Sequence, residues 1–252
     1  MRVIVTRPAT QAAQWVQNLR ERGIDALPLP LIDIVAPLDT APLAQAWSQL
    51  PQQRLVVFVS PNAAEQFFAH RPAARGWPDA VMAASTGPGT AQALRRAGVP
   101  APAIIEPASD APQFDSEALW ARLGERDWSG APVLVVRGDG GRDWLADTLR
   151  RHGAQLSFVA AYRRAAPRFD AAAQAQLDDA MARPADYLWF FSSSEAIEHL
   201  VQARAGHRWA AARALATHPR IAERARASGF GDVRETRPTL DAVVACIQSI
   251  TS

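Results

Sequence analysis

Short apolar runs recur along the chain, and a polar turn and a segment with helical periodicity follow them. Residues 55–59, 133–136 and 188–191 are apolar at every position, which is typical of strands covered by helices on both faces of a sheet. In the helical segments, residues such as Trp15 and Leu19 have the i, i+4 spacing of one helix face. The alternation predicts an α/β fold built on doubly wound parallel sheets.

This pattern occurs twice in the chain of 252 residues, with an offset of roughly 130 residues. The length alone favours two domains over one. Three pairs of segments match in the same order: 2–24 with 132–154, 55–67 with 188–200, and 85–98 with 216–229. A glycine is expected to end a helix at Gly23, Gly98, Gly153 and Gly229. We therefore predict two similar α/β domains.

Polar turns follow the predicted strands in both copies. Ligands of parallel α/β sheets bind beyond the carboxyl ends of the strands, where these turns lie. The turns would supply hydroxyls, guanidinium groups and helix N-terminal amides to one rim of each domain, and two facing rims would form a cleft. The turns are residues 6–8, 60–62, 86–90, 137–139, 192–194 and 217–220.

The composition excludes several kinds of chemistry. All 27 basic residues are arginines, so a Walker-type phosphate loop, a Schiff base and the lysine of a kinase are excluded. A net charge of +2 with scattered arginines does not indicate a nucleic-acid partner. The histidines lack metal-ligand spacing, and the single cysteine, Cys246, is expected to be a buried helix residue.

The N-terminus shows no signal-peptide pattern. No apolar run approaches the length of about 18 residues that a membrane helix needs. We therefore expect a cytoplasmic protein without a membrane partner.

The segment Ser-Thr-Gly-Pro-Gly-Thr at 85–90 has two interpretations. It is either a capped helix N-terminus with permissive glycines or such a terminus that also binds an anion. A carboxylate fits better than a pyrophosphate, because lysine is absent and the second copy carries His218 and Arg220. Arg7 and Arg137 could each hold a carboxylate in a bidentate fork, or pair with an acid such as Asp143.

Two further segments bear on the site. Gly-Asp-Gly-Gly-Arg-Asp at 138–143 lacks both a calcium-ligand pattern and a dinucleotide fingerprint, so we interpret it as a turn that opens a helix. Tyr162 ends a short apolar run just before two arginines and a proline. Its phenol is expected to lie near the crossing between the domains.

The order and spacing of these motifs resemble the uroporphyrinogen-III synthase family. The motifs are V-x-V-T-R-P near the start, F-x-S-P-N-A, G-x-x-T-A at 87–91, V-L-x-x-R-G followed by Tyr162, and F-x-S-S-E-A at 191–196. The resemblance implies two similar doubly wound parallel-sheet domains joined by a two-stranded connector, the first of them discontinuous. Mapped onto this chain, residues 1–36 and 167–252 form the first domain and residues 37–166 the second.

The resemblance also implies an activity that needs no cofactor and no metal. Hydroxymethylbilane would be dehydrated and closed, with inversion of its last pyrrole ring, to uroporphyrinogen III, and a transient contact with hydroxymethylbilane synthase would be expected. Tyr162 matches the family tyrosine that assists departure of the hydroxyl, since a phenol can donate a proton. The implied substrate contacts are Ser60, Asn62, Thr90, Ser193 and Ser194, together with Arg7, Arg137 and Arg220.

This chain departs from the family pattern at 217–222, where Ile221 replaces a threonine and Arg220 could compensate. An alternative function is a noncatalytic two-lobed sensor for an anionic metabolite, which would use the same rims without needing Tyr162. A nucleotide-sugar transferase is disfavoured, because lysine and a diphosphate fingerprint are both absent.

Overall fold

The computed structural model describes residues 1–73, 75–140 and 144–251. The chain folds into two compact units: unit 1 comprises residues 1–33 and 165–252, and unit 2 comprises residues 34–164. The predicted boundaries, at 36/37 and 166/167, lie a few residues further along the chain. Both observed changes fall within strands, because the chain passes between the units in β3 (Asp33–Val35) and β8 (Gln155–Ala165), which are neighbours in one sheet. These two strands are the two-stranded connector.

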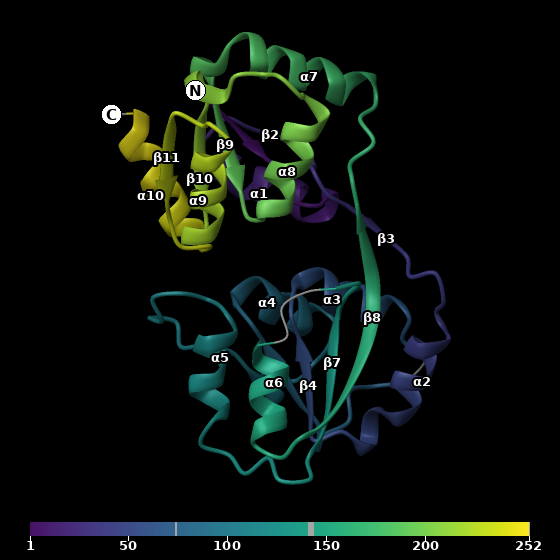
Figure 1. Cartoon of the computed structure of the whole chain (residues 1–252). Coiled ribbons are helices and arrows are strands. Elements are labelled where there is room, and N and C mark those ends of the chain that lie inside the picture. The colour runs from purple at the N-terminus through teal and green to yellow at the C-terminus, as the bar shows by residue number, and fades with distance from the viewer. Residues whose placement is uncertain (74, 141–143, 252) are drawn as a thin grey trace. The chain divides into compact units, whose positions relative to one another are not determined.

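Unit 1 is a parallel sheet flanked by helices (Figure 1). Its strand order is β11-β10-β9-β1-β2, and the paired strands are parallel. The elements are β1 (Arg2–Val5), α1 (Ala9–Glu21), β2 (Ala26–Pro28), α7 (Ala171–Ala182), η3 (Pro184–Asp186), β9 (Tyr187–Phe191), α8 (Ser194–Ala203), η4 (Trp209–Ala211), β10 (Arg213–Ala216), α9 (Pro219–Ala227), β11 (Asp232–Glu235) and α10 (Leu240–Thr251).

Unit 2 repeats this topology and adds one strand. Its order is β3-β8-β7-β4-β5-β6, so β8, β7, β4, β5 and β6 correspond in sequence to β2, β1, β9, β10 and β11 of unit 1. The remaining elements are α2 (Ala41–Gln49), η1 (Leu50–Gln52), β4 (Leu55–Phe58), α3 (Pro61–Ala69), β5 (Met82–Ser85), α4 (Pro88–Arg96), η2 (Ala101–Ala103), β6 (Ile104–Ile105), α5 (Ser116–Leu123), β7 (Pro132–Gly138) and α6 (Trp144–Arg151).

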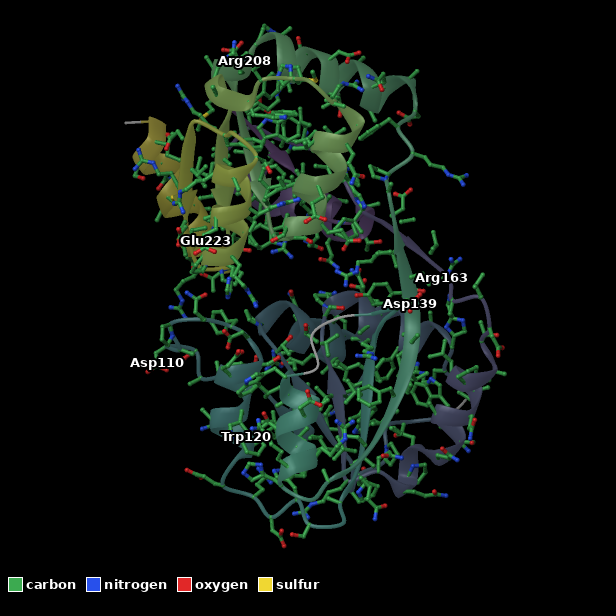
Figure 2. All side chains as sticks on the ribbon, in the orientation of Figure 1. Asp110, Trp120, Asp139, Arg163, Arg208 and Glu223 are labelled. Carbon is green, nitrogen blue, oxygen red and sulfur yellow. The ribbon has the colours of Figure 1, made fainter. Side chains whose placement is uncertain are left out.

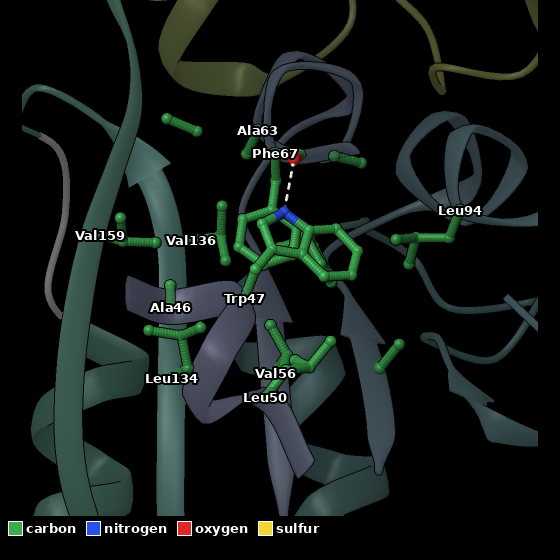
Figure 3. Close-up of a cluster of buried hydrophobic side chains, with 14 of the residues drawn as sticks. Ala46, Trp47, Leu50, Val56, Ala63, Phe67, Leu94, Leu134, Val136 and Val159 are labelled. Carbon is green, nitrogen blue, oxygen red and sulfur yellow. Dashed lines mark hydrogen bonds between the residues drawn. The ribbon is translucent and has the colours of Figure 1, made fainter. Parts of the chain in front are cut away.

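The central strands are apolar throughout because both faces of each sheet are buried. In β4, Val56 and Phe58 join the core cluster under α2, α3 and α4, whereas Leu55 and Val57 join the cluster under α5 and α6. Side chains alternate along a strand, so a strand buried on both faces cannot accommodate polar positions. Figure 3 shows the first of these clusters, which is centred on Trp47. For β4, the predicted cover of both faces by helices is thereby confirmed.

The helix stops predicted from glycine are also confirmed. All four glycines have positive φ and follow the last turn of a helix, where a residue with a Cβ atom would be strained. The φ angles are 75° at Gly23, 91° at Gly98, 88° at Gly153 and 93° at Gly229. The four lie after α1, α4, α6 and α9, so the helix-to-strand turns of the two units lie at equivalent positions.

Candidate active site

Tyr162 lies near the carboxyl end of β8, in unit 2. The register between β7 and β8 shifts at this point: Arg137 pairs with Ala160, but Gly138 pairs with Tyr162. The extra residue is a β-bulge, which changes the direction of the side chains beyond it. Tyr162 is 3% exposed and joins the core cluster between β8 and α3. Its backbone carbonyl accepts a hydrogen bond from the Asp139 amide at 2.9 Å, which fixes the strand end.

The phenol hydroxyl of Tyr162 forms a hydrogen-bonded pair with Ser60. The two oxygens are 3.1 Å apart, and either can be the donor. Ser60 follows β4 and is the N-cap of α3, where its Oγ accepts the Ala63 amide at 3.1 Å. A capping serine is held in one rotamer by this bond, so Ser60 gives the phenol a fixed partner.

Gly138 lies against the ring of the same tyrosine. A Cβ atom built on Gly138 would lie 2.9 Å from Cζ, 3.0 Å from Cε2 and 3.2 Å from the hydroxyl oxygen of Tyr162. Such distances are shorter than normal carbon contacts of about 3.5–4.0 Å. Only glycine lets the strand approach the phenol this closely, so Gly138 and Ser60 together define where the hydroxyl lies.

The neighbouring turns of unit 2 contain the other residues predicted there. Asn62 is partly buried in the first turn of α3, and Thr90 is 3% exposed in the first turn of α4. Gly87 is the N-cap of α4, in an extended conformation. The turn is closed by the Thr86 hydroxyl, which donates to the Val59 carbonyl at 3.1 Å. The structure therefore brings Ser60, Asn62, Thr90 and Tyr162 to one edge of the unit 2 sheet.

Arg137, at the end of β7, is held against an aromatic ring. Its guanidinium carbon lies 4.6 Å from the ring centroid of Phe158, which is 39% exposed on β8. The sequence did not indicate this cation–π contact, because Phe158 lies in a different strand. Asp143, the predicted acidic partner, lies outside the described residues, as do residues 141–142 of the same segment.

Arg7, which corresponds to Arg137 in the repeat, follows β1 in unit 1. Its guanidinium carbon lies 5.0 Å from the Trp15 ring and 5.8 Å from the Phe190 ring. Nη1 donates to Gln11 Oε1 at the long distance of 3.5 Å, and Nε is buried without a partner. Burial lowers the pKa of Arg7 from its ordinary value to about 10. Among the residues that the structure describes, no carboxylate is within ion-pair distance of this cation.

The rest of the unit 1 rim is formed by helix caps. Thr6 is buried, and its hydroxyl donates to the Phe190 carbonyl at 2.8 Å. The Ser193 hydroxyl caps α8 by accepting the Glu195 amide at 3.2 Å, and Ser194 begins that helix. His218 Nδ1 caps α9 by accepting the Arg220 amide at 3.2 Å. Arg220 itself is exposed at the start of the helix.

The predicted site residues therefore fall into two groups. Ser60, Asn62, Thr90, Arg137 and Tyr162 belong to unit 2, whereas Arg7, Ser193, Ser194 and Arg220 belong to unit 1. In each group the residues lie at the carboxyl ends of parallel strands or in the helix starts that follow them.

A metal centre and a reactive thiol are the other kinds of site that the described residues could form. No group of three potential metal ligands occurs among the described histidine, cysteine, aspartate and glutamate residues. Cys246 lies in α10 as predicted but is only partly buried rather than buried. Desolvation raises the pKa of its thiol, which disfavours the reactive thiolate. Within the described chain, no helix is both long enough and apolar enough to span a membrane.

The fold and the site define a class: two-unit α/β proteins with duplicated doubly wound sheets that present hydroxyl, phenol and guanidinium groups at their strand ends. Comparison with known proteins narrows this class. The family model described as uroporphyrinogen-III synthase HemD matches residues 13–245. The uroporphyrinogen-III synthase of Salmonella typhimurium is 34% identical over 178 residues, which cover 69% of this chain and 70% of that protein.

Solved structures agree on the fold. A mutant uroporphyrinogen III synthase from Thermus thermophilus has a TM-score of 0.59 at 16% identity, over 100% of this chain and 97% of that one. The Helicobacter pylori uroporphyrinogen-III synthetase has a TM-score of 0.59 at 15% identity, over 99% and 100% of the two chains.

The chain belongs to the uroporphyrinogen-III synthase family, which comprises lyases of tetrapyrrole (heme) biosynthesis. The expected fold class and the resemblance are confirmed, and the alternative of a noncatalytic sensor is not favoured.

Proposed function

We propose that this chain converts hydroxymethylbilane into uroporphyrinogen III and water. Family membership supports the reaction, and the single structural observation that carries the mechanism is the Ser60–Tyr162 hydroxyl pair, with oxygens 3.1 Å apart. We also expect hydroxymethylbilane synthase to deliver the substrate in a transient contact.

The chemistry demands little of the protein beyond proton donation and orientation. The electron-rich pyrrole expels the terminal hydroxyl: the C–O bond breaks as the oxygen takes a proton from the donor and leaves as water. The resulting carbon centre then forms a bond to the last pyrrole ring. Inversion requires that the bond joining this ring to the rest of the chain breaks and re-forms at the other α-carbon of the ring, which loses a proton that restores the donor. A positioned donor assists the departing oxygen as a general acid. Holding the flexible chain in one folded shape favours closure with inversion over the spontaneous closure without it.

The hydrogen bonds around Tyr162 support a directed relay of donors. The Ala63 amide donates to Ser60 Oγ. In our proposal the Ser60 hydroxyl donates to the phenol oxygen, so the phenol proton is free to point at the leaving hydroxyl. Tyr162 is 3% exposed, and a hydrogen bond screened from bulk water is stronger than one in solution. Ser60 is then a positioning residue and Tyr162 the catalytic one.

Substrate carboxylates and pyrrole groups would be held by the remaining hydroxyls, amides and cations. We propose substrate contacts at Asn62, Thr90 and Arg137 on unit 2 and at Ser193, Ser194 and Arg220 on unit 1. The helix starts at these positions present backbone amides, and such amides suit carboxylates.

The function is tested by the isomer that the protein makes. Hydroxymethylbilane is generated freshly from porphobilinogen with its deaminase, the chain is added, and the products are oxidised and separated by chromatography. Type III isomer in excess over an enzyme-free control is the expected result. Type I isomer alone, at the rate of the spontaneous reaction, would rule the function out.

The role of Tyr162 is tested by Tyr162→Phe. We expect kcat to fall about 10²-fold or more, in line with the loss of a general acid, while the unfolding temperature changes little. Tyr187→Phe is the matched control, because Tyr187 is the only other tyrosine and its hydroxyl bonds to Asp179 at the amino end of β9. Full kcat in Tyr162→Phe would show that the phenol takes no part.

A further inference from the structure

Arg7 is a partly buried cation that has no counter-ion in the part of the chain that the structure describes. Its Nε is buried and unpartnered, and Nη1 has only the 3.5 Å contact with the neutral Gln11. Two other arginines of unit 1 illustrate the usual arrangement: Arg2 lies 2.7 Å from Asp25, and Arg226 lies 3.1 Å from Glu235. Among the described residues, Arg7 has no such carboxylate.

The buried guanidinium of Arg7 destabilises the fold unless a ligand binds to it. Burial alone lowers the pKa of Arg7 to about 10, with no opposing contribution from a nearby acid. Uncompensated charges in proteins normally neutralise, pair or bind a ligand, and an arginine rarely gives up its proton at neutral pH. A ligand carboxylate would therefore satisfy a charge that the protein leaves unpaired.

The side chain is also held in a defined orientation. The guanidinium carbon is within 5.0 Å of the Trp15 ring and 5.8 Å of the Phe190 ring, and these rings are themselves 5.1 Å apart. Stacking of this kind orients a planar guanidinium without using its hydrogen-bond donors. Arg7 retains some exposed surface, and Nη2 has no acceptor among the described residues, so an incoming anion displaces no existing ion pair.

We propose that Arg7 is a carboxylate-binding site and that it takes one acetate or propionate group of the linear tetrapyrrole, with Trp15 and Phe190 as the residues that position it. The proposal rests on the proposed function for the identity of the substrate. The site lies where β1 ends, beside the start of α1, which is the edge of a parallel sheet that binds ligands. A planar guanidinium matches a carboxylate in bidentate geometry, which neither a hydroxyl nor an amide can do.

The experiment compares Arg7→Gln and Arg7→Lys with the wild-type chain in the isomer-resolved assay. We expect Arg7→Gln to raise KM for hydroxymethylbilane about tenfold or more, as is typical when a charged hydrogen bond is lost, and to change kcat much less. Arg7→Lys keeps the charge but not the planar fork, so its KM should lie between those of Arg7→Gln and the wild type.

Arg208→Gln is the matched control. Arg208 is exposed and precedes η4, at the amino end of β10, and Figure 2 shows it and Glu223 at opposite ends of unit 1. The variant removes the same charge from the same unit, so a KM equal to that of the wild type is expected.

Thermal unfolding separates ligand binding from a structural role. If Arg7 is kept for binding, Arg7→Gln will unfold at or above the wild-type temperature, because an uncompensated charge has been removed. An unchanged KM, or a higher KM accompanied by a clear loss of stability, would overturn the proposal. Failure of the proposed function itself is distinguishable, because the wild-type chain would then yield no type III isomer before any Arg7 variant is compared.

Discussion

Replacing Gly138 by alanine should show whether the position of the Tyr162 phenol, which we propose to be catalytic, matters as well as its presence. The added Cβ would lie 2.9 Å from Cζ and 3.2 Å from the hydroxyl oxygen of Tyr162, so the ring must retreat by roughly 0.5–1 Å to reach a normal contact distance. Overpacking of this size costs about 1–3 kcal/mol of unfolding free energy. A catalytic group displaced by about 1 Å loses about 10²-fold in rate, and we expect kcat to fall accordingly.

The assay pairs kcat for the type III isomer with urea unfolding. Gly76→Ala is the control within unit 2, because a Cβ there meets no atom within 4 Å. A double-mutant cycle with Tyr162→Phe locates the effect: if Gly138 acts through the phenol hydroxyl, Gly138→Ala should lower kcat little further once that hydroxyl is gone. Normal kcat in a folded Gly138→Ala protein would refute the argument that Gly138 positions Tyr162.

Two further substitutions test the packing of the units by urea unfolding. A Cβ on Gly231 would lie 2.0 Å from the backbone carbonyl oxygen of Ala210, so Gly231→Ala must shift the backbone. We expect the free energy of unfolding to fall by about 3 kcal/mol or more. A fall below about 0.5 kcal/mol would contradict the close approach. Trp47→Phe removes the 2.9 Å hydrogen bond from Nε1 to the Phe67 carbonyl and leaves a cavity in the cluster of Figure 3. We expect the free energy of unfolding to fall by about 2–4 kcal/mol. An unchanged urea midpoint would show that the cluster repacks without cost.

The fold was predictable because its signals are local and periodic. Continuous apolar runs indicate that a strand is buried on both faces, and a glycine after a helical segment indicates a helix end in the left-handed conformation. Both signals occur twice at a nearly constant offset, so the same topology was expected in each half. The boundaries between the units were harder to predict from the sequence. They fall inside β3 and β8, and no sequence pattern within a strand indicates where one unit ends.

The candidate site was predictable as a set of turns but not as a set of contacts. Ser60 and Tyr162 are 102 positions apart, and their contact depends on the bulge between β7 and β8, which no local pattern reveals. The same limit applies to Gly138, which the sequence suggested only as a turn glycine. Its importance arises from a ring in the neighbouring strand. The cation–π contact of Arg7 with Phe190 likewise joins residues that meet only through the pairing of β1 with β9.

The two repeat-related arginines share a contact with an aromatic ring, and Arg7 carries an electrostatic cost. Each follows an equivalent strand and lies over an aromatic ring, Phe158 for Arg137 and Trp15 for Arg7. The folded-state pKa of Arg7, about 10, is below the ordinary value that the unfolded chain has. The unfolded chain therefore binds more protons between these values, and the penalty is fully present at neutral pH and is relieved only as the pH rises through this window.

A lowering of this size corresponds to about 3 kcal/mol against folding, and a cation–π contact worth about 0.5–2 kcal/mol offsets only part of it. An acid beside Arg7 would remove the remainder, yet it would also occupy the guanidinium that a substrate carboxylate needs. The absence of such an acid among the described residues is thus what a binding role requires. Stability and binding make opposite demands at this position, and the proposed carboxylate site would meet the demand of binding.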